Sequence, residues 1–268
     1  MRQLVFTPLF SGSSGNATYI SDGTDAVIAD AGVSASRILN EIARLGLDAS
    51  LVRAIVATHE HSDHVSGISP LARKLNVPIY ATRGTWEGMG RQAGKLSPEQ
   101  KRVIDAGSGF SVGDMDILSF PTPHDALESC GYVFSLGRVS AAIATDIGHI
   151  NGDWLSCVSS CGIVLLEADY DRDMLLSGPY PFELKRRIQG KKGHLSNDDA
   201  AQAAHTLVCS GARQIILGHM SKINNFPALA LKTVENFLAE EGVCPGRDVY
   251  VSAALREGAS GVYSIRED

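Results

Sequence analysis

Hydrophobic positions along the chain fall into two patterns, short continuous runs and stretches with helical spacing. Short apolar runs predict buried strands, and they cover residues 4–10, 17–21, 26–29, 54–57, 77–81, 103–104, 115–120, 131–136, 139–145, 163–166, 214–217, 249–253 and 261–265. Apolar residues spaced three and four apart predict helices over residues 34–45, 65–75, 181–189, 196–208 and 229–240. Strands and helices therefore alternate in both halves of the chain, which is typical of an α/β protein.

Turn-forming and capping residues mark the ends of several of these elements. Asp22-Gly23 predicts a hairpin, Ser34 predicts a helix start, and the sequence from Ser196 to Asp199 predicts a capping box. Residues 83–101 show no clear period, and we expect a partly helical excursion over the functional site. Because no linker or internal repeat interrupts the pattern, we expect one domain over residues 1–268.

The most informative stretch is His59-Glu60-His61-Ser62-Asp63-His64, which lies where a buried strand ends and a helix starts. Neutral imidazoles and carboxylates together suit divalent metal ions. His59 and His61 are two residues apart and can converge on one ion, whereas Asp63 and His64 diverge toward a second ion. A zinc helix of the His-Glu-x-x-His type is excluded because Asp63 occupies the second histidine position. A solvated histidine-rich loop is the alternative, and the preceding buried strand disfavours it.

Further candidates for metal binding or catalysis follow later strands. His124 comes after a proline-rich turn, Asp146 after residues 139–145, and His219 after residues 214–217. Functional residues of α/β proteins gather at such strand ends. A carboxylate at position 146 would be neutralised if it bridged two cations. Asp30 and Glu167 also end strands, and Asp30 is a candidate for holding a ligand histidine.

His149 and His205 have interpretations that involve neither metal binding nor catalysis. His149 is expected at the surface or behind a ligand, and His205 is expected to be partly buried within a helix.

Composition limits the cellular context and the class of partner. The chain has 268 residues, a net charge of −6 and 6% aromatic residues, so base-stacking surfaces should be few. Its five cysteines include no Cys-x-x-Cys pair, which favours free thiols in a reducing cytoplasm. No secretory signal pattern appears, and no apolar run approaches ~18 residues. We therefore expect a soluble cytoplasmic protein that does not enter the membrane; the sequence does not indicate its oligomeric state.

A basic segment precedes His194 although the chain as a whole is acidic. Five positive charges fall within eight residues, at Lys185, Arg186, Arg187, Lys191 and Lys192. The segment is either a solvated face or a groove that neutralises phosphates.

The small residues at 11–16 present a similar choice. They form either a plain hairpin connection or a floor beneath the metals, with Asn16 near the substrate. Ser196 is a further candidate for substrate binding.

The hexapeptide, His124, Asp146 and His219, all at strand ends and in this order, resemble the metallo-β-lactamase-fold hydrolases. The resemblance implies a four-layer αββα sandwich of two mixed sheets flanked by helices. It also implies the ligands: His59, His61 and His124 on one metal, Asp63, His64 and His219 on the other, and Asp146 between them. Zinc is the first expectation, and manganese or iron is possible. Diiron redox members of the superfamily carry Glu where this chain has His61, so hydrolysis is favoured.

Further motifs resemble the bacterial YycJ/WalJ branch of that superfamily. They are the segments 11–17, 121–126, 178–181 and 193–197, together with the hexapeptide. The branch implies a nuclease with 5′-to-3′ exonuclease activity on DNA, and we expect single-stranded DNA as the substrate. Asp169-Tyr170 departs from the Asn-His expected in relatives, which puts local substrate contacts in question.

Phosphodiester hydrolysis suggests roles for the remaining side chains. Two ions ~3.5–4 Å apart would activate a water for attack on phosphorus, with Asp63 contributing to catalysis. The leaving alkoxide needs a proton that metal ligands do not supply, and we assign it to His194, oriented by Glu167. The tRNA 3′-processing endonucleases of the superfamily resemble this arrangement.

Several alternatives remain open from the sequence. His194 could contact only a substrate phosphate. The chain could hydrolyse a small phosphodiester or (thio)ester metabolite, or it could bind metal without catalysis.

Overall fold

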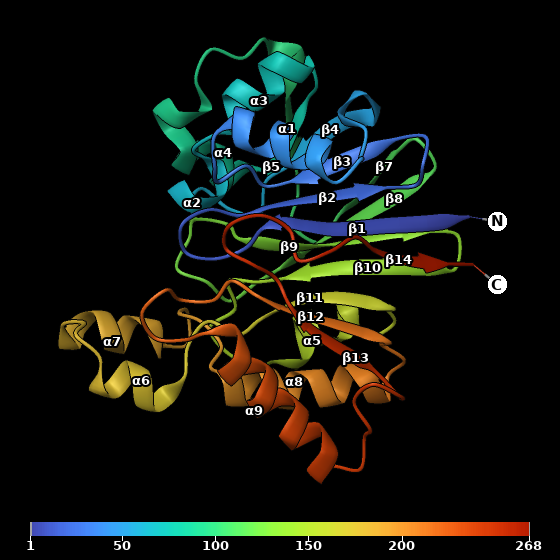
Figure 1. The fold of residues 1–268 in the computed structure, drawn as a ribbon. Coiled ribbons are helices and arrows are strands. Elements are labelled where there is room, and N and C mark those ends of the chain that lie inside the picture. Colours follow the sequence, from blue (N-terminus) through green and yellow to red (C-terminus); the bar gives the residue numbers. More distant parts are fainter. Residues whose placement is uncertain (1, 268) are drawn as a thin grey trace.

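Two seven-stranded sheets packed face to face form the centre of the structure, and helices cover both outer faces (Figure 1). The computed structural model describes residues 2–267. The predicted four-layer αββα arrangement of two mixed sheets is confirmed.

The first sheet contains the N-terminal strands and the last strand of the chain. Its order is β14 (Tyr263–Arg266), β1 (Gln3–Phe10), β2 (Ala17–Ser21), β3 (Ala26–Ala29), β4 (Val52–Val56), β5 (Ile79–Thr82) and β6 (Lys101–Ile104). Strands β14 to β3 pair antiparallel, and β3 to β6 pair parallel.

The second sheet repeats this mixture of directions. Its order is β13 (Tyr250–Ala253), β12 (Gln214–Gly218), β11 (Ile163–Glu167), β10 (Val139–Ala144), β9 (Cys130–Leu136), β8 (Met115–Pro121) and β7 (Gly109–Val112). Strands β7 to β10 pair antiparallel and β10 to β13 pair parallel.

The helices divide between the two outer faces, with one pair standing apart (Figure 1). The first sheet is covered by α1 (Ala35–Arg44), α3 (Ile68–Leu75) and α4 (Arg83–Met89), and the second by α5 (Gly152–Val158), α8 (Asn197–Cys209) and α9 (Pro227–Glu240). The short α2 (Ser62–Val65) follows β4, while α6 (Arg172–Ser177) and α7 (Phe182–Ile188) project from the body. Short 3₁₀ turns are η1 (Ala49–Leu51), η2 (Gly90–Ala93) and η3 (Pro98–Gln100). No helix in the described part of the chain has the length and apolar character needed to span a bilayer.

Successive side chains of a strand point to opposite faces of its sheet, so they pack alternately in the core between the sheets and in an outer core beneath the helices. In β2, Tyr19 packs with the helices of the first sheet, whereas its neighbour Ile20 packs between the sheets. The inter-sheet core also contains Phe6 of β1 and Phe134 of β9, so both sheets contribute to it. Each fully buried large apolar side chain contributes about 1.5–3 kcal/mol through removal from water.

Most predicted elements are present, and the differences have identifiable causes. The helix predicted over residues 65–75 is two helices separated at Ser66-Gly67. A Cβ at Gly67 would lie 1.9 Å from the carbonyl oxygen of Val33, and the Gly67 N–H donates to the carbonyl of Ala31. This tertiary contact fixes the break. Ser34 occupies the N-cap position of α1, but its side chain makes no capping hydrogen bond; the capping box of α8 forms as predicted.

The segment 83–101 is partly helical, as expected, and it lies beside the hexapeptide, where a Cβ at Gly88 would be 2.3 Å from the side chain of Glu60. Met89 and Ala93 are buried in the outer core of the first sheet. Trp86 packs against the same core and donates its indole N–H to the carbonyl of Arg102. The segment therefore extends the helical layer beside β5 and β6. Three short elements, β7, α5 and α6, were not predicted.

The site lies where strands of both sheets end, above a close backbone crossing at Gly32. The Gly32 N–H donates to the carbonyl of Asn16, whose N–H donates to the carbonyl of Asp63. A Cβ at Gly32 would lie 1.6 Å from that Asp63 oxygen. Only glycine leaves room for the hexapeptide at this point.

Gly32→Ala is therefore expected to destabilise the protein by more than about 3 kcal/mol, because the backbone of Asp63 must move. The melting temperature should fall by roughly 6–12 °C. Gly152→Ala is the matched control, because a Cβ there meets nothing within 4 Å and Gly152 begins α5. It should change stability by less than about 1 kcal/mol, with a stabilising sign. Equal melting temperatures for the two variants would contradict the close crossing.

Candidate metal centre and active site

Seven histidine and aspartate side chains from both halves of the chain converge at the strand ends. His59 and His61 follow β4, His64 lies in α2, His124 follows β8, Asp146 follows β10, and His219 follows β12. Together with Asp63 they are the seven ligands implied by the sequence, and the structure brings all of them together.

Left-handed backbone at three strand ends aims side chains into this centre. Asp30, Asp146 and His219 have φ of 62°, 59° and 54°. Such conformations cost non-glycine residues on the order of 1–3 kcal/mol each and persist only where surrounding structure imposes them. Three of the four non-glycine residues with positive φ in the described chain therefore belong to the site.

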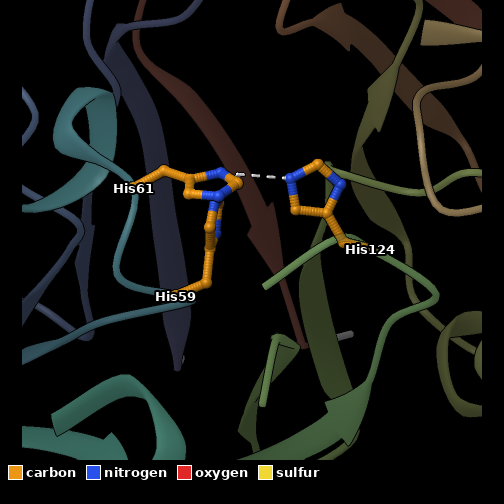
Figure 2. Close-up of side chains that lie close together, drawn as sticks. All are labelled: His59, His61 and His124. Atoms are coloured by element: carbon orange, nitrogen blue, oxygen red, sulfur yellow. Dashed lines mark hydrogen bonds between the residues drawn. The ribbon is translucent and has the colours of Figure 1, made fainter. Parts of the chain in front are cut away.

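The first group consists of His59, His61 and His124, whose rings converge in Figure 2. Nδ1 of His61 lies 3.3 Å from Nε2 of His124. Two nitrogens bound to one tetrahedral zinc at about 2.05 Å would be roughly 3.3 Å apart. The observed separation matches that of two ligands sharing an ion.

The second group consists of Asp63, His64 and His219. Oδ2 of Asp63 lies 3.5 Å from Nε2 of His64 and 3.5 Å from Nε2 of His219. Asp146 faces both groups: its Oδ1 is 3.6 Å from Nε2 of His124 and 3.5 Å from Nε2 of His219, and its Oδ2 is 3.4 Å from Nε2 of His64. These are again distances between ligands of a common ion.

Several of the inward-facing atoms are buried without a hydrogen bond. Nε2 of His59, Nε2 of His219 and Oδ2 of Asp146 have no hydrogen-bond partner among the described residues. Buried polar atoms are almost always paired, so an unpaired set converging on one point needs a further partner. Imidazole nitrogens and carboxylate oxygens are ligands for divalent metals. The cluster therefore fits divalent metal ions.

The outer nitrogens of the same histidines are held by other groups. Nδ1 of His64 lies 2.8 Å from Oδ2 of Asp30, as predicted for Asp30. Nδ1 of His124 lies 3.1 Å from the carbonyl oxygen of Gly193, and Nδ1 of His59 lies 3.0 Å from Oγ1 of Thr58. Such contacts select the tautomer that leaves the inner nitrogen free for a metal.

Burial lowers the pKa of these imidazoles, and nearby charges lower the pKa of His59 further but raise that of His64. Burial lowers the pKa of His59, and the neighbouring imidazoles lower it further, which keeps the ring neutral. Burial also opposes the charged form of His64, but Asp146, Asp30 and Asp63 raise its pKa to about 9. The three carboxylates therefore favour positive charge at this point of the cluster.

Glu167, fully buried at the end of β11, joins the metal cluster to His194. Its Oε1 lies 2.8 Å from Nδ1 of His194 and 3.1 Å from Nδ1 of His219. Its Oε2 accepts hydrogen bonds from the N–H groups of Ile147 and Leu195. Burial would raise the pKa of Glu167, but His194 and His219 hold it well below its ordinary value.

Glu167 therefore favours the protonated form of His194 and fixes the orientation of its ring. Burial opposes its charged form, but Glu167 and Asp169 raise the pKa of His194 to about 9. Nδ1 is taken by Glu167, and Nε2 makes no hydrogen bond to the described residues. The predicted pairing of His194 with Glu167 is present, and the contact of Glu167 with His219 was not predicted.

A cavity of about 220 Å³ opens beside these groups. Five of the expected metal or catalytic residues line it: His61, Asp63, Asp146, His194 and His219. Arg187 also lines it, and six further residues were not predicted as its lining: Ser13, Asp169, Tyr180, Leu184, Ile188 and Ser221.

Sequence signals for those six residues were uneven. Ser13 and Tyr180 lie in segments 11–17 and 178–181, which resemble the YycJ/WalJ branch. Asp169 belongs to Asp169-Tyr170, where this chain departs from that branch. Burial raises the pKa of Asp169 to about 6. Ser221 follows His219 by two residues and carried no signal.

Two proposed substrate-binding residues are buried and do not line the cavity. Asn16 is mostly buried, with Nδ2 3.0 Å from Nε2 of His64 and Oδ1 accepting from the N–H of Gly12. Ser196 is fully buried, and its hydroxyl bonds to Asp199 in the capping box. Neither side chain is among the cavity lining.

Three of the five cations in the basic segment have a partner in the structure. Arg187 pairs with Asp125 through two hydrogen bonds, and Arg186 pairs with Glu183 at 2.6 Å. Nζ of Lys185 donates to the carbonyl of Leu176.

The other two cations, Lys191 and Lys192, are exposed, and neither forms an ion pair within residues 2–267. His149 has Nδ1 2.9 Å from the carbonyl oxygen of Lys191, and His205 lies partly buried within α8, as predicted. All five cysteines are free, as expected.

Comparison with known proteins identifies relatives of this arrangement. A family model described as a β-lactamase superfamily domain matches residues 24–220, a range that contains all seven converging residues. Exodeoxyribonuclease WalJ of Streptococcus pneumoniae (serotype 2, strain D39) is 37% identical over 248 residues, 92% of each chain. Exodeoxyribonuclease YycJ of Bacillus anthracis is 34% identical over 239 residues, 89% of this chain and 90% of that protein.

Among solved structures, the metallo-β-lactamase fold protein YhfI of Bacillus subtilis aligns with a TM-score of 0.73. At 15% identity, over 98% of this chain and 100% of that one, it supports the fold alone. Fold, sequence motifs and relatives agree, and the chain belongs to the β-lactamase superfamily, in the branch that contains WalJ and YycJ.

Proposed function

We propose that this chain is a metal-dependent phosphodiesterase that degrades DNA as a 5′-to-3′ exonuclease. The observation that carries the choice of substrate is its similarity, along about nine tenths of its length, to proteins named exodeoxyribonucleases. The reaction type is supported by the geometry, because a complete ligand cluster adjoins a separate proton donor. We place the protein in the cytoplasm, where its cysteines would stay reduced.

The cluster would hold two divalent ions. One would be bound by His59, His61 and His124 and the other by Asp63, His64 and His219, with Asp146 shared. Bound ions would neutralise phosphate charge and lower the pKa of a coordinated water. Zinc suits this donor set, and manganese or iron remains compatible with it.

Asp63 supports catalysis as well as ligation in this proposal. It lines the cavity, and although burial opposes it, His64 and His219 hold the pKa of Asp63 below its ordinary value. An ionised carboxylate at this position can accept a hydrogen bond from the attacking water and orient it toward phosphorus.

His194 supplies the proton for the leaving oxygen. Nδ1 is held by Glu167, so Nε2 is the atom that can donate into the cavity. A protonated imidazole there would protonate the departing alkoxide as the P–O bond breaks. Glu167 orients His194 and His219 through the same oxygen.

A small phosphodiester is the second candidate substrate. The cavity is only about 220 Å³, and Asp125 neutralises Arg187, the basic side chain that lines it. A compact site with little free positive charge is compatible with a metabolite that carries a single phosphodiester.

A substrate panel separates the two candidates. End-labelled single- and double-stranded DNA and RNA would each be incubated with zinc, manganese or magnesium, alongside bis-p-nitrophenyl phosphate. We expect single-stranded DNA to be shortened stepwise from its 5′ end, and this cleavage to weaken steeply with salt. Turnover of bis-p-nitrophenyl phosphate without cleavage of any nucleic acid would contradict the nuclease and favour the small phosphodiester.

Metal content is expected to reach two ions per chain on gentle purification or reconstitution. Chelation should lower the melting temperature by roughly 16–32 °C, because ions at ~1,000 times their dissociation constant contribute about 4 kcal/mol each, or about 8 kcal/mol for two. Asp146→Ala should reduce occupancy of both positions, whereas His205→Ala, a control far from the cluster, should leave two ions. Fewer than one ion per chain, with no gain on reconstitution, would contradict the dinuclear site.

His194→Ala is expected to lower kcat by ~10²–10⁴ on DNA with metal content intact. A p-nitrophenolate leaving group needs no protonation and should recover most of that loss. Glu167→Gln should also lower kcat and, because it disturbs His219, weaken metal binding by about 10–100-fold. His149→Ala is the control histidine and should behave as wild type. If the activated leaving group does not rescue His194→Ala, His194 binds substrate and does not donate a proton.

A further inference from the structure

One aromatic ring on a helix that lines the cavity is largely exposed to solvent. Phe182, the first residue of α7, is 73% exposed, the highest value among the exposed large apolar residues of the described chain. Removing such a ring from water would be favourable by about 1.5–3 kcal/mol. Nothing within the fold takes up this contact.

The ring is nevertheless held on a defined support. Helices α6 and α7 form an arm that projects from the body (Figure 1). The arm has its own small core of Tyr170, Leu175 and Ile188, with Tyr180 and Leu184 packed against it. Nζ of Lys185 on α7 donates to the carbonyl of Leu176 on α6, which ties the two helices together. Phe182 is thus presented from an ordered surface.

The same helix forms one wall of the cavity. Leu184, Arg187 and Ile188 line it, as does Tyr180 just before the helix. Phe182 is two residues from Tyr180, so their Cα atoms are at most about 7 Å apart. Helical periodicity puts Phe182 on the side of Lys185 and Arg186, away from the lining residues. A strand that leaves the cavity would reach the ring by crossing α7, over Lys185 and Arg186.

The charge around Phe182 suits a phosphate backbone. Residues 182–192 contain five basic side chains within a chain of net charge −6. Arg186 pairs with Glu183 and Arg187 with Asp125, whereas Lys185, Lys191 and Lys192 form no ion pair with the described residues. Lysine is depleted at the cores of protein interfaces. Aromatic rings combined with basic side chains are typical of sites for single-stranded nucleic acid.

We propose that the α6–α7 arm is a stacking platform, on which an unpaired base of the substrate strand lies against Phe182. The inference rests on the proposed nuclease function and specifies how the strand is recognised. An internal base of a duplex has both faces covered by its neighbours and cannot lie on the ring. The platform would therefore select an unpaired end and hold the strand without regard to sequence.

Phe182→Ala tests the platform because an exposed side chain can be removed without damage to the core. The expected result is a 5- to 150-fold rise in KM on single-stranded oligonucleotides, as loss of one stacked base predicts. Hydrolysis of bis-p-nitrophenyl phosphate, which carries no base, should be unchanged. Phe182→Tyr should retain function, and Phe182→Leu, which keeps apolar bulk without an aromatic face, should not.

Oligonucleotides that contain an abasic site provide a complementary test. In a series of oligonucleotides with one abasic site at successive positions, one position should weaken wild-type binding as much as Phe182→Ala does. At that position the variant should show no further loss. Leu176→Ala removes an aliphatic residue that is 59% exposed on the neighbouring helix, and it should match wild type.

Several outcomes would overturn the platform. Equal loss in Phe182→Leu and Phe182→Tyr, equal loss in Leu176→Ala, or a change of oligomeric state in Phe182→Ala would assign the patch to protein contact. If wild type cleaves DNA and Phe182→Ala cleaves it equally well, the platform fails while the nuclease stands. If wild type cleaves no nucleic acid, the nuclease fails; fluorescence anisotropy with labelled oligonucleotides then tests the platform separately, and equal affinities would reject it.

Discussion

The carboxylate of Glu167 is the interaction on which the site depends most. It is fully buried at the end of β11, where an unpaired charge would cost several kcal/mol, and two backbone N–H groups and two imidazoles compensate it. Because one oxygen faces both His194 and His219, the position of the proton donor is tied to that of a metal ligand. The same contacts join β10, β11 and β12 to the segment before α8. The Glu167 carboxylate therefore contributes both to the stability of the fold and to the geometry of the site.

The large apolar core of the fold offsets local features that lower its stability. Left-handed backbone at Asp30, Asp146 and His219 and a cluster of desolvated imidazoles both oppose folding. Three apolar clusters, two beneath helices and one between the sheets, hold the strand ends in place against these costs. The centre is consequently formed in advance of any ligand. Such preorganisation is what electrostatic catalysis requires, since little reorganisation is left for the reaction itself.

Much of this arrangement could be predicted from the sequence because strand ends and metal-type residues coincide. The αββα fold was implied by the resemblance to the metallo-β-lactamase-fold hydrolases, and the role of Asp30 in holding a ligand histidine followed from its position at a strand end. Contacts that depend on side-chain direction after irregular backbone were not predicted, such as the contact of Glu167 with His219. Long-range pairs also escaped it: Arg187 reads as a free cation until the structure places Asp125 against it. Short elements such as α6 lack enough residues to show a period.

The distribution of ligands between the two sheets has a mechanical consequence. His64 follows the first sheet and His219 the second, and the protein has no disulfide among its five cysteines. An ion held by both residues would act as a reversible cross-link that closes a very long loop and restricts the unfolded chain, much as a disulfide does. Its strength would follow the supply of metal and be independent of thiol redox state. Resistance to proteolysis would then report on the metal status of the cell.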